Sequence, residues 1–420
     1  MDRFVIRGGN PLKGKIRVSG AKNAVLPLFA AALLADGPCR LTNVPRLRDV
    51  HTMIRVIETL GAKVEWIEPG EVQIDGSGVT NLEAPYDLVK TMRASFIVLG
   101  PLVARHGYAR VALPGGCAIG VRQVDLHLKG LQAMGATIEM GEGYVAAHAK
   151  QLHGGLIYLD FPSVGATENL MLAASLTPGV TIIENAAMEP EIGDLARFLT
   201  SMGARVKGAG SKVIEVSGVE RLAAANHRVI PDRIEAGTFM IAAAITGGHV
   251  TVEQAPCDML ESLTAKLLET GASIYLGEDS VEVTGPKTIR AVNLTTQPHP
   301  GFPTDLQAPF MAYLALARGT SLVTETIFEN RFMHVAELRR MGADIQVQSA
   351  RGALLNGVSH LSGAPVMASD LRAGAALVVA ALAAQGETDI SRIYHVDRGY
   401  EMLDAKLRGA GADIERIKEA

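Results

Sequence analysis

The chain has 420 residues, of which 48% are hydrophobic and 20% charged, and its formal net charge is -4. One hydrophobic core stops growing well below this length, so we expect two domains of about 200 residues each. The composition argues against a disordered or fibrous protein. The 40 basic residues are outweighed by 44 acidic ones. The chain therefore lacks the net positive charge that is typical of nucleic-acid-binding proteins.

The apolar runs and the cysteines predict a cytoplasmic protein. Residues 1–5 form no apolar signal region, and the longest apolar stretch, residues 373–384, is too short to span a bilayer. Cys39, Cys117 and Cys257 are odd in number and far apart. This spacing fits neither a disulfide framework nor a zinc site.

In chain order, the predicted elements form an internal repeat. Six Gly-Ala pairs end amphipathic stretches at intervals of 68 to 74 residues, with their glycines at 61, 135, 203, 271, 342 and 411. Each glycine fits the end of a helix, and a strand-like alternation follows it. In every copy the amphipathic stretch is preceded by an Ala-rich run, another glycine and a short β-type run. Each repeat therefore predicts an apolar helix, a strand, an amphipathic helix and further strands.

The apolar helices predict the layering of the fold. Because a helix such as residues 236–245 is apolar nearly all round, it should lie beneath sheets rather than at the surface. Six repeats make two sets of three, with a seam near residues 229–232. We therefore expect an α/β protein with helices inside and strands outside.

Basic residues recur at the starts of these buried helices. They are Lys22, Arg93, Arg233 and Arg372. A cation at a helix N-terminus opposes the helix dipole unless an anion lies nearby. Taken singly, the Ser, Thr and Asp residues beside them are ordinary N-caps, but four cations at equivalent positions favour an anion-binding site.

The glycine-rich segment 113–126 carries a thiol beside a guanidinium, Cys117 and Arg122. A free cysteine is most often a small buried hydrophobe, and this interpretation suits Cys39 and Cys257. A glycine-rich loop is hard to bury, so Cys117 is the candidate reactive thiol.

Several segments together resemble one family over the whole chain. They are Ser19–Ala24, the Cys117 loop, Phe302–Asp305, Glu325–His334 and Arg398–Tyr400. They are similar to the UDP-N-acetylglucosamine 1-carboxyvinyltransferases of the EPSP synthase superfamily. The resemblance implies two inside-out α/β barrel-like domains, each of three repeated βαβ-type units with pseudo-threefold symmetry, buried helices and outer sheets. The first domain would comprise residues 22–230, and the second residues 1–21 plus 231–420.

The resemblance also implies the reaction. The enolpyruvyl group of phosphoenolpyruvate would move to the 3-hydroxyl of UDP-N-acetylglucosamine with release of phosphate, the first committed step of peptidoglycan synthesis. The implied partners are these two small molecules, with no cofactor, nucleic acid, membrane or obligate protein partner. No metal is expected either, because His395 and Asp397 lack a third ligand.

Individual roles follow from the resemblance. Lys22, Arg122 and Arg398 would hold the phosphate of phosphoenolpyruvate, Arg331 and Arg372 its carboxylate, and Asn23 the reacting centre. The positions that match nucleotide-sugar contacts are Arg93, Arg122, Gln123, Val124, Asp125, Leu126, Ser163, Val164, Gly165, Asp305 and Ile327. Near them, Phe161 precedes Pro162 and Ser163 where some members carry a lysine, which leaves the diphosphate contacts open.

The chemistry requires both an acid and a base. In the family pattern Cys117 donates the proton and also attaches covalently to the substrate, and Lys22 and Arg398 complete the catalytic set. Nearby cations favour the thiolate form of Cys117, whereas a proton donor must start as the thiol. The sequence therefore leaves open the balance between the acid and nucleophile roles of Cys117. Asp305 is the expected base, with Asp370 second.

Two alternatives remain at the level of sequence. An enzyme of the 5-enolpyruvylshikimate-3-phosphate synthase type would share the fold but not the Gly115-Gly116-Cys117 loop. A catalytically silent regulatory paralogue would keep the scaffold, but it would not need Lys22 or Asp305.

Overall fold

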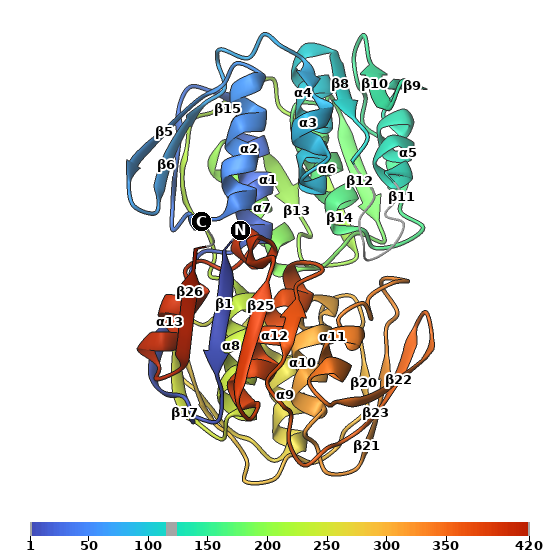
Figure 1. Cartoon of the computed structure of the whole chain (residues 1–420). Coiled ribbons are helices and arrows are strands. Elements are labelled where there is room, and N and C mark those ends of the chain that lie inside the picture. Colours follow the sequence, from blue (N-terminus) through green and yellow to red (C-terminus); the bar gives the residue numbers. More distant parts are fainter. Residues whose placement is uncertain (1, 115–123, 419–420) are drawn as a thin grey trace. The chain divides into compact units, whose positions relative to one another are not determined.

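The computed structural model of the chain describes residues 2–114 and 124–418 (Figure 1). Their contacts divide these residues into two compact units. Unit 1 contains residues 2–19 and 231–418, and unit 2 contains residues 20–114 and 124–230. The chain passes between the units at residues 19–20 and 230–231, so its N-terminal segment folds with its C-terminal half.

Unit 2 combines helices with short strands. Its helices are α1 (Lys22–Ala32), α2 (Arg48–Thr59), α3 (Tyr86–Val89), η1 (Arg93–Val98), α4 (Leu99–His106), α5 (Asp125–Ala133), α6 (Val164–Ser175) and α7 (Pro190–Ser201). Its strands are β3 (Ala35–Asp36), β4 (Cys39–Thr42), β5 (Lys63–Glu68), β6 (Glu71–Asp75), β7 (Glu83–Ala84), β8 (Tyr108–Ala112), β9 (Thr137–Gly141), β10 (Tyr144–His148), β11 (Leu156–Tyr158), β12 (Val180–Glu184), β13 (Arg205–Lys207), β14 (Val213–Ser217), β15 (Leu222–Ala223) and β16 (Asn226–Arg228). The strand orders of its four-stranded sheets are β16-β4-β6-β5, β7-β8-β10-β9 and β11-β12-β14-β13.

Unit 1 also combines helices with short strands. Its helices are α8 (Arg233–Ile245), η2 (Cys257–Met259), α9 (Glu261–Thr270), η3 (Thr304–Leu306), α10 (Gln307–Leu314), α11 (Val335–Arg340), α12 (Leu371–Ala383), η4 (Ile393–Arg398) and α13 (Leu403–Gly409). Its strands are β1 (Arg3–Arg7), β2 (Lys13–Arg17), β17 (His249–Glu253), β18 (Ser273–Leu276), β19 (Ser280–Thr284), β20 (Leu294–Thr295), β21 (Thr320–Thr324), β22 (Asp344–Ser349), β23 (Gly352–Asn356), β24 (Pro365–Met367), β25 (Glu387–Ser391) and β26 (Asp413–Ile417). The strand orders of the four-stranded sheets of unit 1 are β24-β25-β1-β26, β18-β19-β17-β2 and β20-β21-β23-β22.

The sheets repeat one pairing pattern. In each four-stranded sheet of the described residues, one parallel pair adjoins two antiparallel pairs, as in β11-β12-β14-β13. In unit 1, β2 pairs in parallel with β17, and β1 pairs with both β25 and β26. The N-terminal strands therefore complete two sheets of unit 1. Among the described residues the sheets stay separate and do not close into one barrel.

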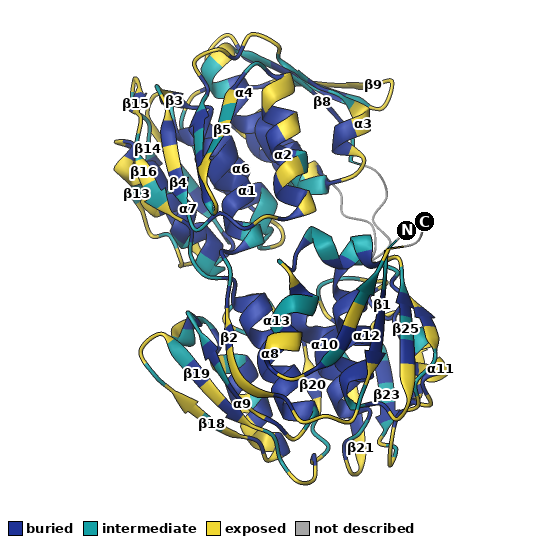
Figure 2. Ribbon diagram, turned by 60° about the vertical axis from the view of Figure 1, so that its left-hand side comes forward, coloured by how far each residue is buried: buried dark blue, intermediate teal, exposed yellow. Residues whose placement is uncertain are grey.

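The layering predicted from the apolar helices is confirmed. Every residue of α8 is buried, and α6, α10 and α12 are buried along most of their length. Figure 2 shows these helices as largely dark blue, whereas many strands carry exposed positions. The small alanine side chains let the helices approach closely, and the apolar faces of the surrounding sheets complete each core.

The predicted glycine positions are also confirmed. The six repeat glycines have φ between 91° and 106°, the left-handed region that a residue with a Cβ adopts only with strain. Each glycine lets the chain leave an amphipathic helix and enter the next strand. Among the described residues, no helix combines the length and apolar composition needed to cross a membrane.

Candidate active site

In unit 1, two buried arginines converge on one carboxylate. Arg331 Nη2 donates to Asp305 Oδ1 at 2.7 Å, and Arg372 Nη2 donates to Asp305 Oδ2 at 2.9 Å. Both arginine side chains are 4% exposed, and that of Asp305 is 24% exposed. We call these three residues the arginine clamp. It joins residues that the sequence assigned to one site, although the contacts span 26 and 67 positions.

Each residue of the clamp is placed by a different element. Asp305 lies in η3 at the start of α10, Arg331 lies before α11, and Arg372 is the second residue of α12. Asp370 caps α12, since its Oδ1 accepts from the backbone N–H groups of Arg372 and Ala373 at 2.9 and 3.0 Å. The structure thus gives Asp370, the second candidate base, a role in holding the helix that carries Arg372.

The electrostatics keep Arg372 charged despite its burial. Burial opposes the guanidinium charge, but Asp305, Tyr400 and Asp232 outweigh it and raise the pKa of Arg372. Its Nε and Nη1 atoms are buried without a hydrogen-bond partner among the described residues. Each of these two donors forms a planar fork only together with Nη2, the atom that already binds Asp305.

Two buried polar residues with no sequence-predicted role lie near the clamp. His334 is 2% exposed, and burial lowers the pKa of its imidazole. Tyr400 is also buried, and its hydroxyl lies 2.9 Å from Thr238 Oγ1. Residue type alone does not distinguish His334 and Tyr400 from surface residues. Their position at the ends of recognisable motifs is the only signal that could have found them.

Arg398 is the last residue of η4. Its neighbour Asp397 accepts hydrogen bonds from Arg416 at 2.6 and 3.0 Å, so this carboxylate anchors β26. Within residues 2–114 and 124–418, no group of three or more His, Cys, Asp or Glu side chains is arranged to hold a metal ion.

In unit 2, Lys22 is the first residue of α1, followed by Asn23. The Lys22 ammonium lies 3.1 Å from Asp49 Oδ2, whose side chain is 3% exposed. The sequence predicted that cations at helix starts need an anion. In both units a carboxylate of the protein supplies one, Asp49 for Lys22 and Asp305 for Arg372.

The candidate nucleotide-sugar residues of unit 2 gather at the starts of two packed helices, α5 and α6. Val124, Asp125 and Leu126 lie at the start of α5. Ser163 caps α6, its Oγ accepting from Ala166 N at 3.3 Å, and Val164 and Gly165 open that helix. Backbone N–H groups at two helix N-termini suit an anionic ligand.

A buried hydrogen-bond chain joins these two helices. The backbone N–H of Gly100 donates to Asn169 Oδ1 at 2.7 Å, which directs Asn169 Nδ2 towards His127 Nδ1 at 2.9 Å. His127 therefore accepts at Nδ1 and carries its proton on Nε2. Burial, followed by the charge of Arg93, lowers the pKa of His127 to about 3. The structure thus brings Arg93 near the same helix ends.

The remaining predicted site residues fall in the glycine-rich segment 113–126 and in the loop after β21. Cys117, Arg122 and Gln123 lie outside the described residues. Burial raises the thiol pKa values of Cys39 and Cys257, as expected for unreactive thiols. Ile327 is described and lies in the loop after β21.

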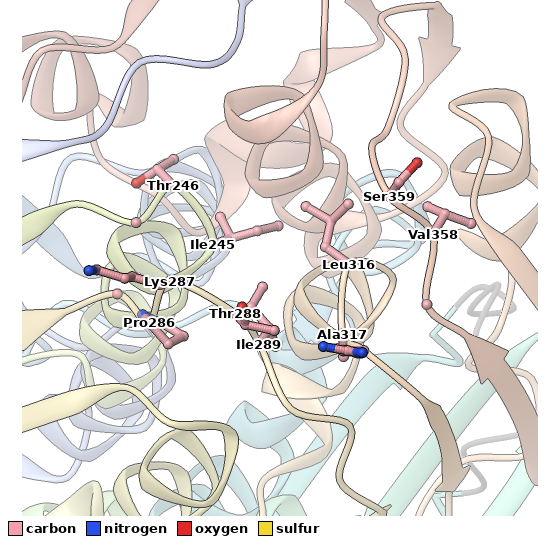
Figure 3. A pocket seen from close by; sticks show the side chains of 14 residues that line it. Ile245, Thr246, Pro286, Lys287, Thr288, Ile289, Leu316, Ala317, Val358 and Ser359 are labelled. Carbon is pink, nitrogen blue, oxygen red and sulfur yellow. The ribbon is translucent and has the colours of Figure 1, made fainter.

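A cavity of about 580 Å³ lies elsewhere in unit 1, where α8 and α10 end (Figure 3). Its lining includes the exposed side chains of Lys287 and Arg318 but none of the predicted site residues. Exposed lysine and arginine side chains are usually solvated, so the cavity does not compete with the clamp as a candidate site.

Comparison with known proteins identifies the family. Residues 6–407 match the family described as EPSP synthase (3-phosphoshikimate 1-carboxyvinyltransferase). UDP-N-acetylglucosamine 1-carboxyvinyltransferase 2 of Carboxydothermus hydrogenoformans is 57% identical over 421 residues, covering 100% of both chains. The chain belongs to the UDP-N-acetylglucosamine 1-carboxyvinyltransferases, within the EPSP synthase family.

Further relatives agree with this membership. The UDP-N-acetylglucosamine 1-carboxyvinyltransferase of Geotalea uraniireducens is 57% identical over 419 residues and 100% of both chains. The enolpyruvyl transferase NikO from Streptomyces tendae superposes with a TM-score of 0.89 at 27% identity, covering 100% of this chain and 99% of that one. An EPSP synthase from Acinetobacter baumannii, with a TM-score of 0.77 at 21% identity over the full length of both chains, shares the fold.

Proposed function

We propose that this carboxyvinyltransferase family member transfers the enolpyruvyl group of phosphoenolpyruvate to the 3-hydroxyl of UDP-N-acetylglucosamine and releases phosphate. Membership of the family supports the reaction class. One structural observation supports the chemistry: two buried guanidinium groups already hold a carboxylate, that of Asp305. A clamp that binds one carboxylate in the resting protein has the geometry to bind that of a substrate.

In the proposed reaction, the substrate carboxylate replaces Asp305 between Arg331 and Arg372. The freed Asp305 accepts the proton of the sugar 3-hydroxyl, and at the same time the hydroxyl oxygen forms a bond to C2 of the enol. A proton delivered to C3 converts the methylene group to a methyl group. The tetrahedral intermediate then expels phosphate and loses a proton from C3, which restores the double bond as an enol ether.

The other predicted residues complete this scheme. Cys117 is the proposed proton donor at C3, and Lys22, Arg122 and Arg398 bind the phosphate through charge-assisted hydrogen bonds. The Lys22 ammonium forms an ion pair with Asp49 at 3.1 Å. Asn23 is proposed to contact the reacting centre.

The proposed nucleotide-sugar residues lie partly at the joined ends of α5 and α6. Besides Asp305 and Ile327 they are Arg93, Arg122, Gln123, Val124, Asp125, Leu126, Ser163, Val164 and Gly165. We also propose that residues 22–230 and residues 1–21 plus 231–420 are the two domains. In this scheme the enzyme works in the cytoplasm without a metal or cofactor, and its partners are its two substrates.

The purified protein incubated with both substrates tests this function. Mass spectrometry is expected to detect the enolpyruvyl ether of UDP-N-acetylglucosamine, and phosphate is expected to appear in equal amount. Product formed instead from shikimate 3-phosphate would move the assignment to the other branch of the family.

The proposed role of Cys117 has a separate test. Cys117→Ser is expected to abolish turnover while the protein still folds, and fosfomycin is expected to add its mass at Cys117. Modification at Cys257 instead would reject the assignment of the reactive thiol.

A further inference from the structure

A fully buried carboxylate connects the segments that carry Asp305 and Ile327. Glu325 directly follows β21 and is 0% exposed. Its Oε2 accepts a hydrogen bond from Thr304 Oγ1 at 2.9 Å. Its Oε1 accepts from the backbone N–H groups of Ile327 and Phe328 at 2.8 and 3.2 Å. One side chain thus ties the residue before Asp305 to the loop that contains Ile327.

A further hydrogen bond reaches the same carboxylate. Thr296, which is 0% exposed, donates from Oγ1 to Glu325 Oε1 at 2.8 Å. The same Oγ1 accepts from Thr326 N at 3.0 Å. A buried carboxylate is tolerated only where donors replace its hydration, and hydrogen bonds to it are stronger than those between neutral groups. The Glu325 side chain is therefore held rigidly.

The residue after the equivalent strand differs in three other repeats. Asn43, Asn185 and Gln254 follow β4, β12 and β17, and they have φ of 58°, 53° and 55°. Glu325 follows the equivalent strand without positive φ. Asn43 and Asn185 each donate from the side chain to a backbone carbonyl at 2.9 and 2.7 Å, whereas Glu325 accepts. This repeat thus exchanges a donor for an acceptor next to the arginine clamp.

We propose that Glu325 is a positioning residue for enolpyruvyl transfer, which sets the placement of Asp305 relative to the Ile327–Phe328 backbone. The inference rests on the proposed function, in which Asp305 accepts the sugar proton and Ile327 contacts the nucleotide sugar. The same loop leads to Arg331, whose guanidinium carbon lies 5.3 Å from the centre of the Phe328 ring. Glu325 acts through these residues and touches no substrate.

The test compares steady-state kinetics of Glu325→Gln with those of the wild type. The variant keeps the shape of the side chain but loses the charge and one acceptor. We expect kcat to fall about 10- to 100-fold, as for loss of hydrogen bonds to a charged group. The KM for UDP-N-acetylglucosamine is expected to rise, while the KM for phosphoenolpyruvate stays within about twofold, because α12 still holds Arg372.

Thr304→Val provides a second variant, because it removes the donor to Oε2 alone. It is expected to lower kcat about 10-fold by itself but less than about 3-fold in the Glu325→Gln background, since the shared interaction is already lost. If Glu325→Gln does not fold, the kinetics of Thr304→Val decide the question.

Thr326→Val is the matched control. It removes a hydrogen bond from Thr326 Oγ1 to the Thr296 carbonyl at 2.6 Å but leaves both Thr304 and the Ile327 and Phe328 amides in place. We expect a lower melting temperature with kcat and both KM values unchanged.

Wild-type kinetics in Glu325→Gln and Thr304→Val would overturn the inference. Kinetic losses in Thr326→Val equal to those in Glu325→Gln would also overturn it, because they would follow stability alone. A wild-type protein without turnover would instead contradict the proposed function itself.

Discussion

Two regions of the molecule, the arginine clamp of unit 1 and the junction of α5 and α6 in unit 2, accommodate buried polar groups in opposite ways. We call them the two partial sites. In unit 1 the arginine clamp keeps charges buried by pairing Arg331 and Arg372 with Asp305. In unit 2 the junction of α5 and α6 keeps His127 neutral and fixes its proton through Asn169. A paired charge can be exchanged for that of a ligand, whereas a neutral buried chain only holds the surrounding backbone in place. The difference teaches that the arginine clamp supplies exchangeable charge, whereas the junction of α5 and α6 supplies fixed orientation.

The largest effect is expected from breaking the clamp. Arg372→Ala removes half of the clamp and leaves Asp305 with one arginine partner. Truncation of one partner of a buried, hydrogen-bonded charge pair between protein and ligand costs about 2–5 kcal/mol of binding free energy, so kcat/KM for phosphoenolpyruvate should fall about 1,000-fold. Arg372→Lys, which keeps the charge without the fork, should recover only part of the loss. Wild-type kinetics in Arg372→Ala would contradict the role of the clamp.

The next effect concerns Asp305 itself. Asp305→Asn keeps the size of the side chain but removes its basicity. Turnover is expected to fall about 100-fold or more, the usual contribution of a general base. A pH–rate profile of the wild type should lose activity on the acid side, and a variant with undiminished kcat would exclude Asp305 as the base.

A smaller effect is expected in unit 2. Asn169→Leu removes the partner of His127 and of the Gly100 amide. We expect the KM for UDP-N-acetylglucosamine to rise about 10-fold, with the KM for phosphoenolpyruvate unchanged. The free energy of unfolding should fall by about 1–3 kcal/mol, because buried groups lose their partners. Equal changes in both KM values would remove the distinction between the two partial sites.

The last prediction concerns no kinetic constant but a pH dependence of stability. The pKa of His127 is lowered to about 3 in the folded protein, against about 6.5 in an unfolded chain. Between these values the unfolded state binds a proton that the folded state excludes, so the free energy of unfolding decreases as pH falls from 6.5 towards 3. One such group contributes at most about 1.4 kcal/mol per pH unit. Urea unfolding between pH 4 and 7 should show a weaker dependence in His127→Gln, and an identical slope would exclude His127.

Sequence patterns predicted the fold well because the signals are local. The repeat glycines need positive φ, and the apolar helices have no polar face to place in water. The contacts of the candidate site are not local. Asp305 meets Arg372 across 67 positions, and tertiary packing of α10 and α12 brings them together. Family resemblance named both residues, but it did not show that they pair with each other.

Other features could not be predicted for the same reason. The sequence treats Asp49, Asn169 and Glu325 as ordinary polar residues, and burial alone turns them into partners of Lys22, His127 and Thr304. The roles of Cys117, Arg122 and Gln123 remain predictions, since these residues lie outside the described part of the chain.

Equilibrium binding of phosphoenolpyruvate to the wild type and to Asp305→Asn, measured by calorimetry, tests the central claim most directly. If Asp305 occupies the position of the substrate carboxylate, its neutral replacement should tighten binding about 2- to 10-fold, because no charged competitor holds the two arginines. Weaker binding to Asp305→Asn than to the wild type would contradict the account.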